Sequence, residues 1–210
     1  MSTTDVIDTL AGIAPGSPLD ELRARRPESR THAQGSYDAL FAPADVSHAS
    51  IPERAAIATF VASLHRQESA VAHYRARLEG EGDERIAATV IELAASAQEL
   101  APVGPYGNFT ADNAPESVPG PRFEITDVAA SYVLGDRLAA ALEHAHLLTL
   151  HPRDAAPDDL RRLEDAGWSA TGIVTLSQLV AFLAFQLRVV AGLTALQATR
   201  AASVTEGAGR

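Results

Sequence analysis

The sequence predicts an all-α protein, and three observations support that fold class. Apolar residues recur at helical spacing in several segments, as Ile57, Phe60, Val61 and Leu64 do after Ser50. Much of the 46% hydrophobic fraction is Ala and Leu, which favour helices that pack closely through small side chains. No alternating apolar–polar pattern of useful length indicates a strand. With 210 residues, the chain fits one domain or two small fused ones.

The composition excludes several classes of function. The formal net charge is -10, and the arginines are scattered among acidic residues. The sequence therefore lacks the basic stripe that is typical of a nucleic-acid binder. The chain contains no Lys, which is typical of a GC-rich coding genome and excludes lysine catalysis. It also contains no Cys, which excludes disulfides, thiolate metal sites and thiol catalysis.

Two further features indicate a cytoplasmic protein without a membrane span. The N-terminus lacks the basic and apolar regions of a signal peptide. The most apolar run, residues 173–196, contains Gln178, Gln186 and Arg188, and therefore indicates a buried helix.

The first half of the chain is predicted to contain an N-terminal arm and then three helices. Residues 1–35 are expected to form an irregular arm, with short helices at 5–11 and 18–25, lying on another subunit or on the body. Residues 36–100 form the first helical half, which begins with a turn of helix at 36–41. Its three main helices are expected to begin after Ser50, at Glu68 or Ser69, and at Glu84, the last ending at Leu100.

The second half is predicted to be helical as well. Residues 101–122 hold five of the twelve prolines and indicate a linker or a lid. Residues 123–197 are expected to form a helix over 129–148 bent near Gly135, a short helix over 158–166 closed by Gly167, and a long helix over 170–191 capped by Ser169. We expect a kink in the long helix near 184–186 and a flexible tail over 198–210.

The segment 50–78 has a distinctive layout. Ser50-x-x-Glu53 is a capping box with Pro52 in the first helical turn, a polar elbow follows at 65–67, and His73 lies on the next helix. This layout resembles the active-site hairpin of the AhpD / carboxymuconolactone decarboxylase family. There a Glu is followed about twelve residues later by Cys-x-x-Cys and then by His. Gln67 and Ala70 stand at the two cysteine positions.

A second block strengthens the resemblance, which points to the peroxidase-related branch of the family. The matching positions are Asp136, Leu148, Thr149, Pro152, Leu163, Gly167, Ile173 and Arg188, while Gln186 departs from an Asn-Arg pair that the family often has. The two blocks cover most of residues 36–196. The resemblance implies an AhpD-like helical bundle, with two halves joined by the Pro-rich loop, that assembles into a dimer, trimer or hexamer.

The hairpin carries the family pattern only in part. His73 is present at an expected position, whereas Ala55 stands where the family Glu is expected and Glu53 lies half a turn earlier. A Cys-x-x-Cys peroxidase needs a thiolate that attacks and a thiol that resolves, so thiol-based hydroperoxide reduction by this chain is excluded. The free N–H groups of the helix after Gln67 suit an anion.

Two functions remain open. If the chain is catalytic, Glu53, His65 and His73 are the candidates for acid–base decarboxylation or isomerisation of a small organic acid or lactone. Alternatively, it is a degenerate paralogue, an oligomeric accessory or binding protein partnered with an active homologue or an oxidoreductase.

Structural roles also account for these candidate residues. The capping box explains Glu53, a core or interface position explains His73, and the end of a helix explains His65. His144 and His146 are two residues apart and are expected on different helix faces. With His151 they form a loose cluster, and neither a metal site nor a cofactor is predicted. Arg188 is expected to contact a buried carboxylate or a carbonyl.

Overall fold

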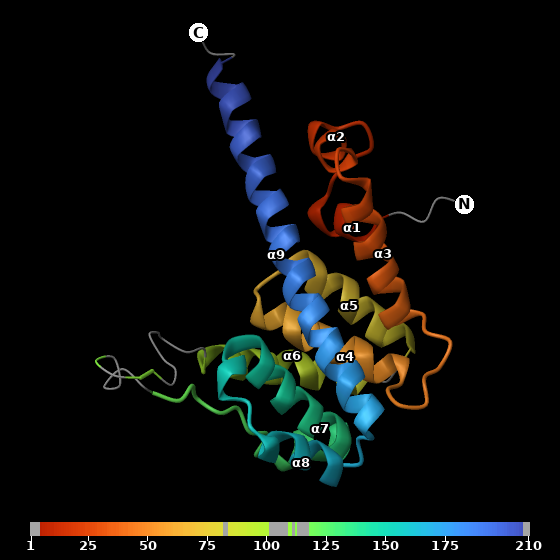
Figure 1. The fold of residues 1–210 in the computed structure, drawn as a ribbon, viewed down its shortest axis with the longest axis vertical. Coiled ribbons are helices and arrows are strands. Elements are labelled where there is room, and N and C mark those ends of the chain that lie inside the picture. Colours follow the sequence, from red (N-terminus) through yellow and green to blue (C-terminus); the bar gives the residue numbers. More distant parts are fainter. Residues whose placement is uncertain (1–4, 82–83, 101–108, 111, 113–117, 208–210) are drawn as a thin grey trace.

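The computed structural model describes residues 5–81, 84–100, 109–110, 112 and 118–207, with side chains described up to residue 200. Within these residues the fold is all-α, as predicted, and no strand occurs. The elements in chain order are α1 (Val6–Ala11), α2 (Pro18–Ala24), α3 (Pro27–Phe41), α4 (Ile51–Leu64), α5 (Glu68–Glu81), α6 (Glu84–Glu99), α7 (Val128–Leu150), the 3₁₀ turn η2 (Pro152–Asp154), α8 (Pro157–Asp165) and α9 (Ala170–Gly207) (Figure 1).

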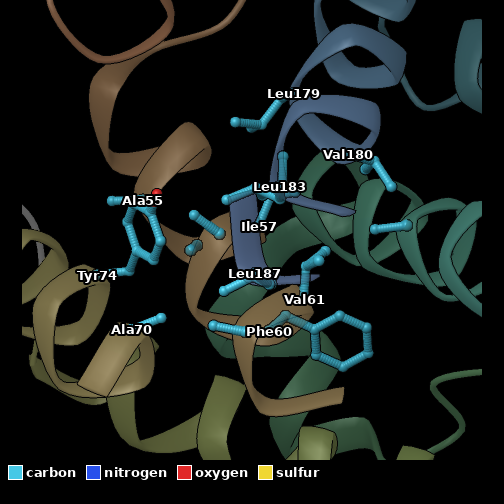
Figure 2. Packing of buried hydrophobic residues seen from close by; sticks show 14 of the residues in the cluster. Ala55, Ile57, Phe60, Val61, Ala70, Tyr74, Leu179, Val180, Leu183 and Leu187 are labelled. Carbon is cyan, nitrogen blue, oxygen red and sulfur yellow. The ribbon is translucent and has the colours of Figure 1, made fainter. Parts of the chain in front are cut away.

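Helix α4 is the centre of the bundle. Every residue from Arg54 to Leu64 is buried, and the helix contacts α3, α5, α6, α7 and α9. A helix that is apolar on all sides must be enclosed by others, which explains its position. The predicted capping box begins it, since the Ser50 side chain accepts from Glu53 N and the Glu53 side chain accepts from Ser50 N. Ile57, Phe60 and Val61 then pack against Leu183 and Leu187 of α9 (Figure 2).

Helix α9 is longer than the sequence indicates. It runs without interruption from Ala170 to Gly207, so neither the kink near 184–186 nor the expected end near Ala191 is observed, and residues 198–207 continue the helix. Its first half is a core element that buries Leu176, Leu179 and Leu183, whereas its C-terminal part extends away from the body (Figure 1). By length and composition the stretch Ala170–Arg200 could cross a membrane, which is weak evidence because core helices share these properties.

The N-terminal segment is more ordered than predicted. Helix α3 spans fifteen residues where one turn was expected, and α1 contacts α3, α5 and α9, so this segment lies on the body. Ion pairs join the three helices: Arg23 pairs with Asp5 and Asp8, and Arg30 pairs with Asp8 and Asp20. The buried residues Ile7 and Leu10 attach α1 to the core. Ion pairs between helices that are separated in sequence leave no local signal. This explains why the sequence analysis underestimated the order of this segment and the length of α3.

The second half follows the sequence closely. Asp127 caps α7. Gly135 interrupts this helix with φ 68° and ψ 161°, a conformation that glycine adopts because it has no Cβ. The end of α8 forms a Schellman motif, because the N–H groups of Gly167 and Trp168 donate to Glu164 O and Leu163 O. Ser169 caps α9 by accepting from Gly172 N at 3.1 Å. Most of the predicted 101–122 linker lies outside the described residues.

Candidate functional site

Glu53 is fixed by three hydrogen bonds at the start of α4. One carboxylate oxygen accepts from Ser50 N at 2.7 Å and Ser50 Oγ at 2.9 Å. The other accepts from Arg137 Nε of α7 at 2.6 Å. Arg137 also donates to the carbonyls of His48 and Gly167, and its guanidinium lies 4.0 Å from the centre of the Trp168 ring. Glu53 is therefore part of a clamp that joins α4, α7 and the α8–α9 connection.

The elbow between α4 and α5 is a tight C-terminal cap. Arg66 adopts a left-handed φ of 54°, while Arg66 N donates to Ser63 O and Gln67 N donates to Ala62 O. His65 is half-buried, and its Nε2 atom has no hydrogen-bond partner among the described residues. Burial, and then the charge of Arg188, lower the pKa of the His65 imidazole. At neutral pH this ring is therefore neutral, with one nitrogen that can accept a proton and one that can donate a hydrogen bond.

The two cysteine-equivalent positions differ sharply in environment. Gln67 is half-buried at the elbow, whereas Ala70 is fully buried and belongs to the core beside Tyr74 (Figure 2). The Tyr74 hydroxyl donates to Gln186 Oε1 of α9, and both side chains are fully buried. Burial raises the pKa of the Tyr74 hydroxyl, so it stays protonated as a donor. Ala70 therefore lies next to a buried hydrogen bond between α5 and α9, in closely packed surroundings.

His73 is paired with a tyrosine from α3. The Tyr37 hydroxyl lies 2.8 Å from His73 Nε2, and both side chains are half-buried. Burial, and secondarily the charge of Arg77, lower the pKa of the His73 imidazole, while burial raises the pKa of the Tyr37 hydroxyl. Both groups are therefore neutral at pH 7, and one donates a hydrogen bond to the other.

The candidate residues do not converge on one point. Glu53 and His65 stand near opposite ends of α4, twelve residues apart, which corresponds to about 18 Å along a helix axis. Glu53 contacts α7 through Arg137, whereas His73 contacts α3 through Tyr37. A general acid and a general base must reach the same substrate within hydrogen-bond distance. The three residues named from the sequence therefore do not form one acid–base centre.

The histidines in α7 and at its C-terminal cap lie closer together than their spacing indicates. His144, His146 and His151 are all buried, and all line one cavity of about 30 Å³ with Asp159 and Arg122. The His146 and His151 rings are 5.5 Å apart. Burial, with the charge of His151 second, lowers the pKa of His146 to about 4. Among the described residues, no group of three such side chains has the arrangement of a metal site.

The sequence analysis did not identify Arg54, Tyr37 or Arg137, whereas Arg188 contacts a carbonyl, one of the two partners expected for it. Arg188 is exposed and its Nη1 donates to Ala184 O of its own helix at 3.1 Å, so it contacts a carbonyl but no buried partner. Arg54 is the buried arginine, and it shares the helical stripe of Ile57 and Val61, a signal that could have identified it. Tyr37 and Arg137 act across long sequence separations, which no local pattern reveals.

Comparison with known proteins gives no assignment. No family model matches the chain, and no curated protein matches it either.

Proposed function

We propose that this chain is an AhpD-like protein of the carboxymuconolactone decarboxylase family, in its peroxidase-related branch, and that it serves as an oligomeric accessory or binding protein. The support is the order of sequence features: the capping box, the elbow with Gln67 and Ala70, His73, and the second block that ends at Arg188. An all-α fold with a helical hairpin at 51–81 is compatible with this proposal. Under it, the two helical halves joined by the Pro-rich loop form one AhpD-like bundle in the cytoplasm.

The observation that carries the non-catalytic role is that Glu53 is fully engaged elsewhere. Its carboxylate accepts three hydrogen bonds within the capping box and the Arg137 clamp. Ala70 is enclosed by the core and cannot present a reactive group. Glu53 and Ala70 of the hairpin therefore each have a structural explanation.

A binding experiment tests this role. The purified chain is mixed with a Cys-x-x-Cys homologue from the same source, and sedimentation velocity measures complex formation. We expect a complex in which the thiol activity of the homologue changes. The proposal is contradicted if no complex forms and the chain alone turns over a small organic acid or lactone.

The acid–base alternative has one specific observation in its favour, the 2.8 Å contact between Tyr37 and His73. In an isomerisation the neutral imidazole would accept a proton from the carbon acid, and the imidazolium so formed would return it to another carbon, with the Tyr37 phenol as a hydrogen-bond donor. Wild type, Tyr37→Phe and His73→Gln are compared against a panel of acidic lactones by product analysis. Turnover that both substitutions abolish, with the fold retained by circular dichroism, identifies an enzyme. Turnover equal in all three proteins rejects this centre.

Homo-oligomerisation is part of the proposal. The C-terminal part of α9 extends beyond the body (Figure 1), and Leu196 on this part is exposed. A second copy that packs on this part of the helix would bury Leu196. Light scattering at micromolar concentration is expected to give a dimer, trimer or hexamer, and a monomer would contradict the expectation.

A further inference from the structure

An open pocket of about 620 Å³ lies between α3, α4 and α9, away from the elbow of the hairpin. These three helices contact one another in pairs (Figure 1). Leu40, Phe182 and Phe185 give the pocket apolar walls, and Gln178 adds an exposed amide. Its volume falls in the range of about 300–1,000 Å³ that small-molecule sites occupy.

Arg54 lines this pocket and is an unusual buried charge. The side chain is 96% buried, since only 4% of its surface is exposed. Nε donates to Ala49 O and Nη1 donates to Leu40 O, each at 2.9 Å. Nη2 makes no hydrogen bond to any described residue, and no described carboxylate forms an ion pair with this guanidinium. Nη2 is not among the fully enclosed polar atoms that lack a partner, so this end of the guanidinium is accessible from the pocket.

The two nearest acidic residues do not supply the missing partner. Glu53 adjoins Arg54 in the chain, but its carboxylate is held by Arg137 and Ser50. Asp45 is exposed and accepts from Ser47 N at 2.8 Å. Both act on Arg54 only as more distant charges, and burial is the larger influence, lowering the pKa of its guanidinium. Arginine nevertheless stays protonated in proteins, so a positive charge faces the pocket.

The chemistry of the lining selects one class of ligand. A guanidinium with a free N–H forms charge-assisted hydrogen bonds to a carboxylate. Arg54 is the single cation among the residues that line the pocket, which matches a single negative charge better than a phosphate dianion. The aromatic rings of Phe182 and Phe185 suit an apolar body.

We propose that this pocket binds a small monocarboxylate with an aromatic or branched aliphatic body, held by Arg54. The inference goes beyond the proposed function, because it uses neither the elbow nor His73 and holds for an accessory protein or an enzyme alike.

Isothermal titration calorimetry with benzoate and 3-phenylpropionate tests the proposal, with benzamide as the uncharged analogue. We expect both carboxylates to bind the wild-type protein and to raise its thermal midpoint, and benzamide to do neither. Arg54→Met is expected to weaken benzoate binding at least tenfold. Arg161→Met on α8 removes the same charge from an exposed side chain and is expected to leave binding unchanged.

A second variant separates binding from folding, because Arg54 also holds the carbonyls of Leu40 and Ala49. Ala39 is exposed and lines the pocket, so Ala39→Trp fills the space while leaving Arg54 in place. We expect this variant to keep its thermal midpoint and to lose benzoate binding. Equal binding of benzoate and benzamide, absence of benzoate binding by wild type, or wild-type affinity in a folded Ala39→Trp protein would each overturn the proposal.

Discussion

Replacing Glu53 by glutamine distinguishes a structural carboxylate from a catalytic one. The change keeps the size of the side chain and removes its charge. The carboxylate accepts hydrogen bonds from Arg137, Ser50 N and Ser50 Oγ. A neutral amide cannot accept all three, because its oxygen accepts but its NH₂ group only donates. The substitution should therefore reduce the stability of the whole fold, since the clamp joins α4 to α7 and to the α8–α9 connection.

The magnitude follows from the geometry. Hydrogen bonds to charged groups contribute about 1.5–3 kcal/mol, and the Glu53 and Arg137 side chains are only 18% and 32% exposed. We expect Glu53→Gln to lower the free energy of unfolding by about 2 kcal/mol. For a domain of this size that loss corresponds to a midpoint lower by roughly 4–8 °C.

Urea unfolding followed by far-UV circular dichroism measures the effect. The matched control is Glu79→Gln, which breaks an exposed ion pair with Arg75 whose N–O distance is 2.8 Å, and should cost less than about 0.5 kcal/mol. A double-mutant cycle with Arg137→Met isolates the coupling between the two side chains. If Glu53→Gln is as stable as the control, the carboxylate is not a structural clamp and its assignment here is wrong.

Three further predictions concern the elbow and the buried histidines. Arg66→Gly removes a side chain from a left-handed backbone position and should raise the free energy of unfolding by about 0.5–1 kcal/mol. Urea unfolding measures this change, and no gain in stability would show that Arg66 is not strained. Burial lowers the pKa of His146 to about 4, below its ordinary value of 6.5, so the unfolded state binds more protons between these values and stability falls as pH decreases through this window. His146→Phe should flatten that dependence in thermal melts, and an unchanged slope would exclude His146 as its source. Gln67→Cys/Ala70→Cys should not restore thiol chemistry, because burial raises the pKa of a thiol at position 70. In thiol titration with each single variant as control, only Cys at 67 should react, and equal reactivity at both positions would refute the packing described.

Local sequence signals predicted the helices well. The capping box at Ser50, the break at Gly135 and the C-terminal cap at Gly167 are each encoded within a few residues, and each is present. The elbow at 65–67 also follows from a short polar interruption. The extents of α3 and α9 were underestimated, because their ends depend on ion pairs in the N-terminal segment and on propagation of an Ala-rich helix beyond the core.

The arrangement of the candidate site could not be predicted in the same way. The contacts of Glu53 with Arg137, His73 with Tyr37, and Tyr74 with Gln186 join residues 84, 36 and 112 positions apart. The sequence analysis placed Glu53, His65 and His73 around one elbow because the three residues lie within one short segment of the chain, and closeness in sequence suggests closeness in space. The length of α4 and the different neighbours of its two ends separate them instead.

Helix α3 of the N-terminal segment contacts the hairpin directly and would contribute to any function that the hairpin performs. Tyr37 orients His73, and its ring packs against Phe41, which stacks on Tyr74 at 5.1 Å between ring centres. Arg77 donates to Phe41 O and fixes the same helix end. Since Leu40 and Ala39 of α3 also line the Arg54 pocket, one helix contributes to both the Tyr37–His73 contact and the proposed carboxylate site. A substitution that shifts α3 is therefore expected to alter both sites together.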